Sequence, residues 1–138
     1  MRRAATGWFM VDDLIPDDVR QFILRFIESV AHLEGLLLLR SDPQTEWTVD
    51  NVAGRLYIDK RQAADILARL SADGFLDAGG GSVPVYRYRP ASTELAQMVD
   101  RVAEYYSKYL IPVTNLIHSR PKPKVQQFAD AFRLRKDK

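Results

Sequence analysis

The spacing of apolar residues predicts two helices in the first third of the chain. From Pro16 onward, apolar side chains recur at intervals of three and four residues, which predicts a helix with one wide buried face. The residues of this face are Val19, Phe22, Ile23, Phe26, Ile27 and Val30. A second helical stretch, 29–40, is apolar on nearly all sides and is predicted to be the central core helix. Gly35 lies within it, and we expect this glycine to permit close helix packing.

Two shorter helices follow, and each has its own start signal. Thr48 precedes apolar residues at helical spacing and is expected to cap the first of them. Asp59 is expected to cap the second, with Gln62 three residues on as in a capping box. The apolar stripe of this second helix consists of Ala63, Ile66, Leu67 and Leu70. Gly74 stands where a left-handed residue commonly ends a helix.

The pattern then changes from helical spacing to the alternation of a strand. The glycine-rich segment 78–82 is typical of a hairpin tip, and alternating residues follow it. Tyr86 and Tyr88 share one face of the predicted strand, which we expect to pack inward. Arg87 and Arg89 share the other face and are expected to point outward.

A long helix is predicted from Thr93 to about position 117, with Ser92 as its N-cap. A seam of apolar residues at alternating three- and four-residue spacing runs along it. Pro112 lacks a backbone donor, so we expect a kink or break near Lys108. A helix that is apolar on two sides needs two partners, one of which we predict to be a second subunit. The predicted dimer interface is Leu95, Met98, Val102, Tyr105, Tyr109 and Leu116.

The residues after His118 combine a short amphipathic helix with basic charge. Seven Lys and Arg residues stand against two Asp in this tail, and Phe128 and Phe132 call for burial. Three interpretations are open: contact with DNA, contact with an acidic or membrane surface, or solvated charges on a docking helix. We favour the docking helix, and the basic tail is also a candidate contact for a protein partner.

Helix, tight turn, helix and two-stranded wing in this order predict a mainly α, winged helix-turn-helix fold with a C-terminal helical extension. The predicted winged-helix domain is 1–91 and the extension is 92–138. The segment 48–90 that carries this order resembles the bacterial winged-helix transcriptional regulators and is MarR-like in its general plan. The resemblance implies that the second helix of the pair enters the major groove of DNA while the wing touches the flanking backbone. Such regulators commonly dimerise through helices outside the wing.

Residues off the apolar stripe of the presumed recognition helix are the candidates for DNA contact. The candidates are Lys60, Arg61, Ala64, Asp65, Ala68 and Arg69 for the groove, with Arg87 and Arg89 for the backbone. The basic side chains can meet phosphates or a guanine edge, an aspartate can accept from a cytosine amine, and alanines let the helix lie close. The same residues would also suit an ordinary solvated helix face.

The distribution of charge bears on this hypothesis. The formal net charge is +2, but residues 1–90 hold 11 Lys and Arg against 13 Asp and Glu, whereas residues 91–138 hold 9 against 5. The basic excess therefore lies outside the winged segment. This favours the alternative hypothesis, a winged-helix adaptor that binds another protein. A ligand-responsive regulator with an apolar pocket beside the long helix is a third hypothesis.

Enzymatic chemistry is the least favoured class. The chain has no cysteine, which excludes thiolate chemistry and disulfides and fits a cytoplasmic protein. His32 and His118 are isolated and do not make a metal site, so a structural role is expected for both. No phosphate loop, zinc-protease pattern or serine elbow occurs. We therefore expect no catalytic residue, cofactor or metal, and the longest aliphatic run, 36–39, is too short to span a membrane.

Overall fold

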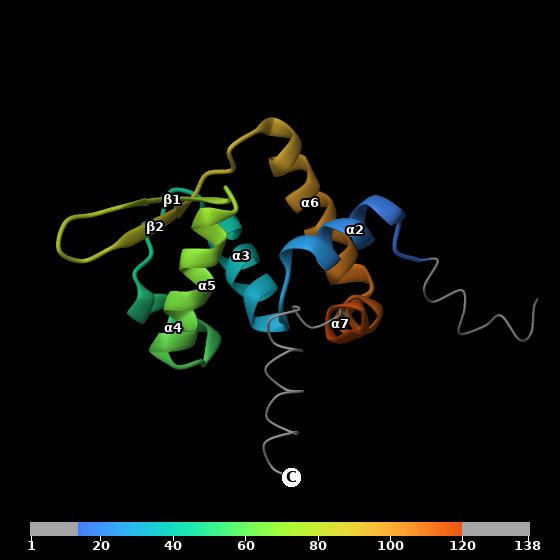
Figure 1. Ribbon diagram of the computed structural model, residues 1–138, viewed down its shortest axis with the longest axis horizontal. Coiled ribbons are helices and arrows are strands. Elements are labelled where there is room, and N and C mark those ends of the chain that lie inside the picture. The colour runs from blue at the N-terminus through green and yellow to red at the C-terminus, as the bar shows by residue number, and fades with distance from the viewer. Residues whose placement is uncertain (1–13, 120–138) are drawn as a thin grey trace, which may run out of the picture.

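The computed structural model describes residues 14–119, and this part of the chain forms six helices and one two-stranded antiparallel sheet (Figure 1). The elements are α2 (Asp17–Phe26), α3 (Val30–Ser41), α4 (Val49–Leu56), α5 (Lys60–Ala72), β1 (Leu76–Gly79), β2 (Val85–Tyr88), α6 (Thr93–Lys108) and α7 (Leu110–Ser119). The predicted fold class, a mainly helical winged helix-turn-helix followed by further helices, is confirmed. The predicted basic tail lies outside the described residues.

Side-chain caps start four of these helices. In each case the capping oxygen accepts a hydrogen bond from the backbone N–H three residues on, at 2.7 to 3.1 Å. The capping residues are Ser29 before α3, Thr48 before α4, Asp59 before α5 and Ser92 before α6. A cap of this kind contributes about 1 kcal/mol, because it satisfies a donor that the helix leaves unpaired. The caps predicted at Thr48, Asp59 and Ser92 are confirmed.

The end of α5 turns the chain into the wing. Gly74 has a φ of +91°, and its N–H donates to the carbonyl of Ser71 while the next N–H, of Phe75, donates to Leu70. These two bonds form a Schellman motif, which confirms the predicted left-handed end. Phe75 is thereby directed into the core, where its ring meets the edges or faces of Phe22 and Phe26 at centroid distances of 5.7 and 5.5 Å.

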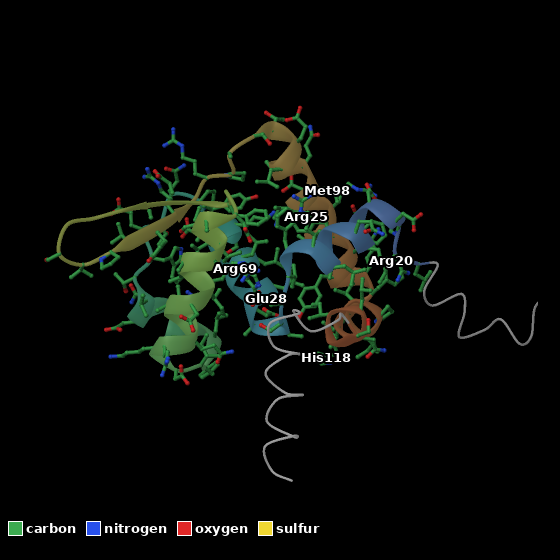
Figure 2. All side chains as sticks on the ribbon, viewed as in Figure 1. Arg20, Arg25, Glu28, Arg69, Met98 and His118 are labelled. Atoms are coloured by element: carbon green, nitrogen blue, oxygen red, sulfur yellow. The ribbon has the colours of Figure 1, made fainter. Side chains whose placement is uncertain are left out.

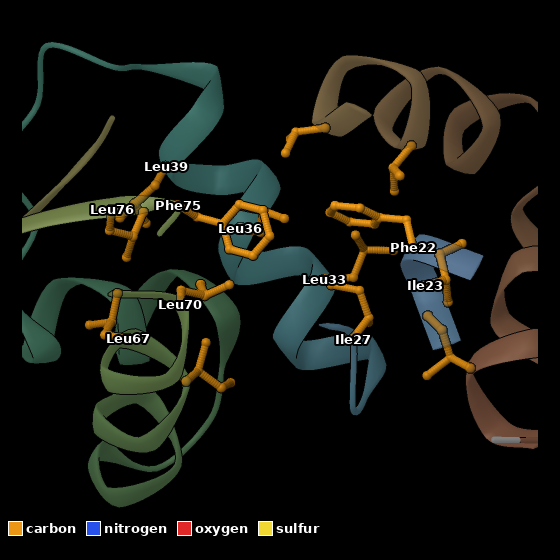
Figure 3. Close-up of a cluster of buried hydrophobic side chains, with 14 of the residues drawn as sticks. Phe22, Ile23, Ile27, Leu33, Leu36, Leu39, Leu67, Leu70, Phe75 and Leu76 are labelled. Carbon is orange, nitrogen blue, oxygen red and sulfur yellow. The ribbon is translucent and has the colours of Figure 1, made fainter. Parts of the chain in front are cut away.

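Helix α3 occupies the centre of the molecule, between the helix-turn-helix and wing on one side and α2, α6 and α7 on the other (Figure 1). It packs against α4, α5 and β2, which confirms its prediction as the central core helix. Gly35 is the point of close approach, because a Cβ built there would lie 3.1 Å from Cγ2 of Ile66 on α5. Figure 3 shows Leu33, Leu36 and Leu39 of α3 within this buried cluster.

The wing is joined to the helices by an additional bridge. β1 and β2 pair from Leu76 opposite Tyr88 to Gly79 opposite Val85. Trp47 extends this pairing, since its N–H and carbonyl each bond Tyr86 at 2.8 Å. The two wing tyrosines pack against the core, as predicted.

The long helix predicted after the wing is divided. α6 ends at Lys108, Tyr109 leaves the helical conformation, and α7 begins at Leu110. The predicted break near Lys108 is therefore confirmed, and its cause is Pro112, which has no N–H to offer the carbonyl four residues earlier. The apolar seam does not continue through this break as one straight surface.

Two residues of the predicted dimer interface belong to the core of the single chain. Val102 has no exposed surface and Leu116 is 8% exposed, because α2, α6 and α7 pack against one another around them. Their assignment to a dimer interface was wrong, since a side chain that its own chain already covers has no surface for a second subunit. Leu95 and Met98 are half-buried and pack at the edge of the core.

Helix α2 also connects the first part of the described chain with its last two helices. It packs with α6 and α7 rather than lying apart from them, while its aromatic residues Phe22 and Phe26 contact Phe75 next to the wing. A single buried cluster consequently runs through all the helices. The division at residue 91 stays a prediction about folding units. Within residues 14–119 no helix has the length and apolar character that a membrane crossing requires.

Candidate nucleic-acid interface

Helix α5 is held by one face and leaves the opposite face free. Its apolar stripe of Ala63, Ile66, Leu67 and Leu70 is buried against α3 and α4. The six groove candidates lie off this stripe: Lys60, Arg61, Asp65, Ala68 and Arg69 are exposed and Ala64 is half-buried. The structure therefore places all six on the surface of α5, but it gives them different surroundings.

The N-terminal turn of α5 carries two exposed cations, Lys60 and Arg61. Lys60 lies 3.5 Å from the Asp50 carboxylate on α4, and both side chains remain largely exposed. Arg61 forms no ion pair with any residue between 14 and 119. The positive end of the helix dipole lies at the same turn. Cationic side chains and unpaired backbone donors therefore coincide where phosphate oxygens would be attracted.

Arg69 has a different environment from the one predicted. Its guanidinium is 2.5 Å from the Glu28 carboxylate and 3.5 Å from Asp73, and Figure 2 shows Arg69 and Glu28 close together where α5 faces the α2–α3 connection. Two carboxylates of its own chain engage Arg69, whose side chain stays 46% exposed, so its assignment to the groove stays a prediction. The ion pairs also fix the C-terminal half of α5 to the body of the molecule.

An open cavity of about 480 Å³ lies beside this ion pair. It is lined by Glu28, Ser29, His32, Gln62, Asp65, Ile66 and Arg69. Asp65, a predicted groove residue, thus lies on the flank of α5 that faces the α2–α3 connection. The carboxylate is exposed there, beside the predicted DNA-facing surface rather than next to Lys60.

His32 has the structural role that its isolation in the sequence predicts. Its side chain is 2% exposed, and Nδ1 accepts a hydrogen bond from the backbone N–H of Glu28 at 3.0 Å. The histidine therefore fastens the α2–α3 connection. Across the described part of the chain, no three His, Asp or Glu residues are grouped in a way that could hold a metal ion.

The wing arginines lie near the sheet but are not paired with acids. Arg87 is half-buried and stands opposite Asp77 in the strand register, whereas Arg89 is exposed just beyond β2. Neither forms an ion pair with the residues between α2 and α7. The glycine tip is exposed and carries no charge, so the electrostatic attraction of the wing comes from its base.

The turn between α4 and α5 contains an exposed residue that the sequence reasoning passed over. Tyr57 ends α4 in a left-handed conformation, with a φ of +57°, and its side chain is 93% exposed. Arg55, two residues earlier, lies over the ring of Trp47 at 5.4 Å from its centroid. The sequence does indicate that Tyr57 is exposed, because it falls outside the helical spacing of the apolar residues around it.

Comparison with known proteins relates this arrangement to solved structures. No protein-family model matches the sequence, and no curated protein matches it. MepR of Staphylococcus aureus, a transcription regulator of the multidrug efflux pump MepA, is similar over 99% of this chain and 98% of its own, with 12% identity and a TM-score of 0.52. A mutant of MepR bound to an oligodeoxyribonucleotide is similar over 99% of both chains, with 11% identity and a TM-score of 0.52.

A MarR family protein from Bacillus stearothermophilus is similar over 94% of this chain and 87% of its own, with 14% identity and a TM-score of 0.49. Identities at this level concern the fold alone. The winged helix-turn-helix plan expected from the sequence is confirmed in that sense, and the chain has the fold of MepR.

Proposed function

We propose that this chain is a DNA-binding transcriptional regulator that places α5 in the major groove and acts as a homodimer. The observation that carries the proposal is the exposed N-terminal turn of α5, a capped helix whose other face is buried. Lys60 lies on this turn beside Arg61, which has no ion pair within residues 14–119. A rigid helix with cations at its free end suits the major groove, which admits an α-helix and presents guanine acceptors to arginine.

Within this proposal, the candidate residues have different tasks. Arg61 would contact a base edge or a phosphate, and Lys60 would contact a phosphate after leaving Asp50. Ala64 and Ala68 are small enough to let the helix backbone approach the groove. Arg87 and Arg89 would meet the flanking backbone. Arg69 would act through α5, whose position it secures by its ion pairs.

The homodimer is proposed on the apolar surface that remains around the junction of α6 and α7. Leu110 and Ile111 are 51% and 63% exposed at the start of α7, and the half-buried rings of Tyr105 and Tyr109 are stacked beside them on the chain. Exposed aliphatic side chains next to aromatic rings are typical of a surface that a partner covers. A two-fold dimer would present two α5 helices to a pseudo-palindromic site.

The function is tested by binding to random-sequence duplex DNA at two salt concentrations, with sequencing of what is retained. We expect enrichment of a palindromic site and an affinity that falls steeply with salt. Arg61→Ala should weaken binding to the enriched site by about 1–3 kcal/mol if it contacts a base edge. Arg25→Ala, which removes an exposed charge on α2, is the matched control and should bind like the wild type.

Arg69→Ala separates the two tasks assigned to arginines of α5. Because Arg69 is engaged with Glu28 and Asp73, we expect a small loss of thermal stability and a smaller effect on affinity than for Arg61→Ala. Equal affinity of the wild type and Arg61→Ala would contradict the assignment of the N-terminal turn of α5. Failure of the wild type to retain any duplex at low salt would contradict the DNA-binding function itself.

The acidic balance of residues 1–90 favours one other candidate, a winged-helix adaptor for a protein partner. Such an adaptor would retain no DNA at low salt, and a pull-down with the full chain would then be the experiment to make.

A further inference from the structure

Tyr57 occupies a position where its residue type is physically unfavourable. Among residues 14–119 it is the one non-glycine residue with a positive φ. It is also the most exposed of the large apolar and aromatic side chains on the surface of this part of the chain, at 93%. A left-handed conformation brings Cβ close to the following carbonyl, so glycine or asparagine is the usual choice. Full exposure of a phenol ring also forgoes the stabilisation that burial of such a ring normally contributes.

The backbone conformation at this position has a clear local cause. The carbonyl of Ala53 accepts from the N–H of Tyr57 and, at 3.1 Å, from the N–H of Ile58. These bonds end α4, and Ile58 then packs against the core. The turn therefore requires a left-handed residue at position 57, but it does not require a tyrosine.

The side chain itself has no role within the described chain. The Tyr57 ring makes no aromatic contact and its hydroxyl makes no hydrogen bond to any residue between 14 and 119. A strained residue whose side chain makes neither of these contacts with residues 14–119 points to a role toward a partner. Tyr57 lies between Arg55 and the Lys60–Arg61 pair. Because these neighbours are cationic, the partner that Tyr57 contacts is expected to be negatively charged.

We propose that Tyr57 is a DNA-contacting residue whose phenolic hydroxyl donates a hydrogen bond to a backbone phosphate. This inference rests on the proposed function and extends it to the turn of the helix-turn-helix. The turn immediately precedes α5, so a duplex that receives the N-terminal turn of α5 has its sugar-phosphate backbone beside position 57. Tyrosine hydroxyls are among the groups that commonly donate to phosphate oxygens and fix the register of a protein on DNA.

A phosphate contact makes a specific prediction that a base contact does not. It should contribute equally to the enriched site and to an unrelated duplex, because phosphates carry no sequence information. It should also leave the salt dependence unchanged, since a neutral phenol displaces no counterion, whereas loss of a phosphate-bound arginine or lysine reduces the salt slope.

The test compares the wild-type chain with Tyr57→Phe and Tyr57→Gly, using the enriched duplex and an unrelated duplex at several salt concentrations. Tyr57→Phe removes only the hydroxyl and should weaken binding to both duplexes about 3-fold to 10-fold, with an unchanged salt slope. Tyr57→Gly should weaken binding at least as much, while its thermal unfolding midpoint does not fall, because glycine adopts the left-handed conformation without strain.

Each outcome has a defined meaning. Wild-type affinity in Tyr57→Phe overturns the hydrogen bond to phosphate, and so does a loss confined to the enriched duplex. A loss of affinity in Tyr57→Gly that accompanies a lowered unfolding midpoint indicates a structural role and also overturns the proposal. If the wild type binds neither duplex, the proposed function fails instead. If the wild type binds and Arg61→Ala weakens binding while Tyr57→Phe does not, only the proposal about Tyr57 fails.

Discussion

Two tyrosines that pack near the core differ in what their hydroxyl groups contact. The Tyr106 hydroxyl on α6 donates a 2.6 Å hydrogen bond to the Glu34 carboxylate on α3. The Tyr88 hydroxyl on β2 is buried and has no hydrogen-bond partner among the described residues. Burial, together with the Glu34 carboxylate, raises the pKa of Tyr106 to about 12, and burial raises the pKa of Tyr88 to about 12. The same side-chain type therefore stabilises the fold at one position and leaves a polar atom unsatisfied at the other.

Removal of the two hydroxyl groups should have opposite consequences. Tyr106→Phe should lower the free energy of unfolding by about 1 kcal/mol, because the hydrogen bond is lost and Glu34 is left without it. Tyr88→Phe should leave stability unchanged or raise it, since a buried hydroxyl without a partner is removed. Chemical denaturation at neutral pH measures both changes, and equal losses in the two variants would contradict the difference in contacts.

The raised pKa values also predict a loss of stability in alkali. Both phenols have a higher pKa in the folded chain than the ordinary value of 10.0, so folding favours their protonated forms. The free energy of unfolding is therefore unaffected by these groups below about pH 10 and falls as pH rises through about 12. The variant with both tyrosines replaced by phenylalanine should show a flatter stability profile over this range.

At the scale of elements, the contact between α3 and α5 determines where α5, the proposed DNA-contacting helix, lies. Gly35 allows the approach, because a Cβ at this position would lie 3.1 Å from Ile66. Gly54 on α4 offers a contrast, since a Cβ there would meet no atom within 4 Å. One glycine thus serves packing between two helices and the other lies on an open helix surface.

Substitution of the two glycines by valine should separate packing from helix propensity. Gly35→Val should destabilise the chain by about 1–3 kcal/mol, because the added methyl groups displace Ile66 and push α5 outward. Gly54→Val should change stability by less than about 0.5 kcal/mol, since glycine and valine differ little in a helix. Thermal unfolding of both variants is the measurement. A comparable loss at the two positions would mean that backbone propensity, rather than the α3–α5 contact, accounts for the effect.

At the scale of the whole molecule, one apolar core links the helix-turn-helix to the helices that flank it. Phe75, at the start of the wing, contacts Phe22 and Phe26 of α2, and α2 in turn packs on α6 and α7. A partner bound to α6 and α7 would therefore be connected to α5 through packed side chains. This arrangement is suited to holding two α5 helices at a fixed separation in a dimer.

The proposed dimer surface can be tested by introducing a charge. Ile111→Asp should convert the dimer to a monomer, because an aspartate would be buried without a partner at the centre of the interface. Val83→Asp is the matched control, since Val83 is a similarly exposed aliphatic residue near the wing tip, and it should retain the dimer mass. Light scattering gives the mass of each, and a wild type that is monomeric at high concentration would contradict the homodimer.

Much of the helix-turn-helix and wing was predictable because its signals act over a few residues. The oxygens of Thr48, Asp59 and Ser92 each reach an N–H three positions along the chain, and Gly74 ends α5 by bonds within its own last turn. The inward direction of Tyr86 and Tyr88 follows from strand alternation in the same way. Sequence alone therefore determined the order of the elements, the caps at Thr48, Asp59 and Ser92, and the apolar face of α5.

Tertiary structure alone decided which of the remaining side chains are free. Val102 and Leu116 have the same sequence spacing as Leu95 and Tyr109, but α2, α6 and α7 pack around the first two and cover them. Arg69 resembles Arg61 in the sequence, yet it is engaged by Glu28 from the connection between α2 and α3. Sequence spacing indicates the face of a helix on which a residue lies. The residues that it contacts depend on segments that are distant in the sequence and that folding brings close.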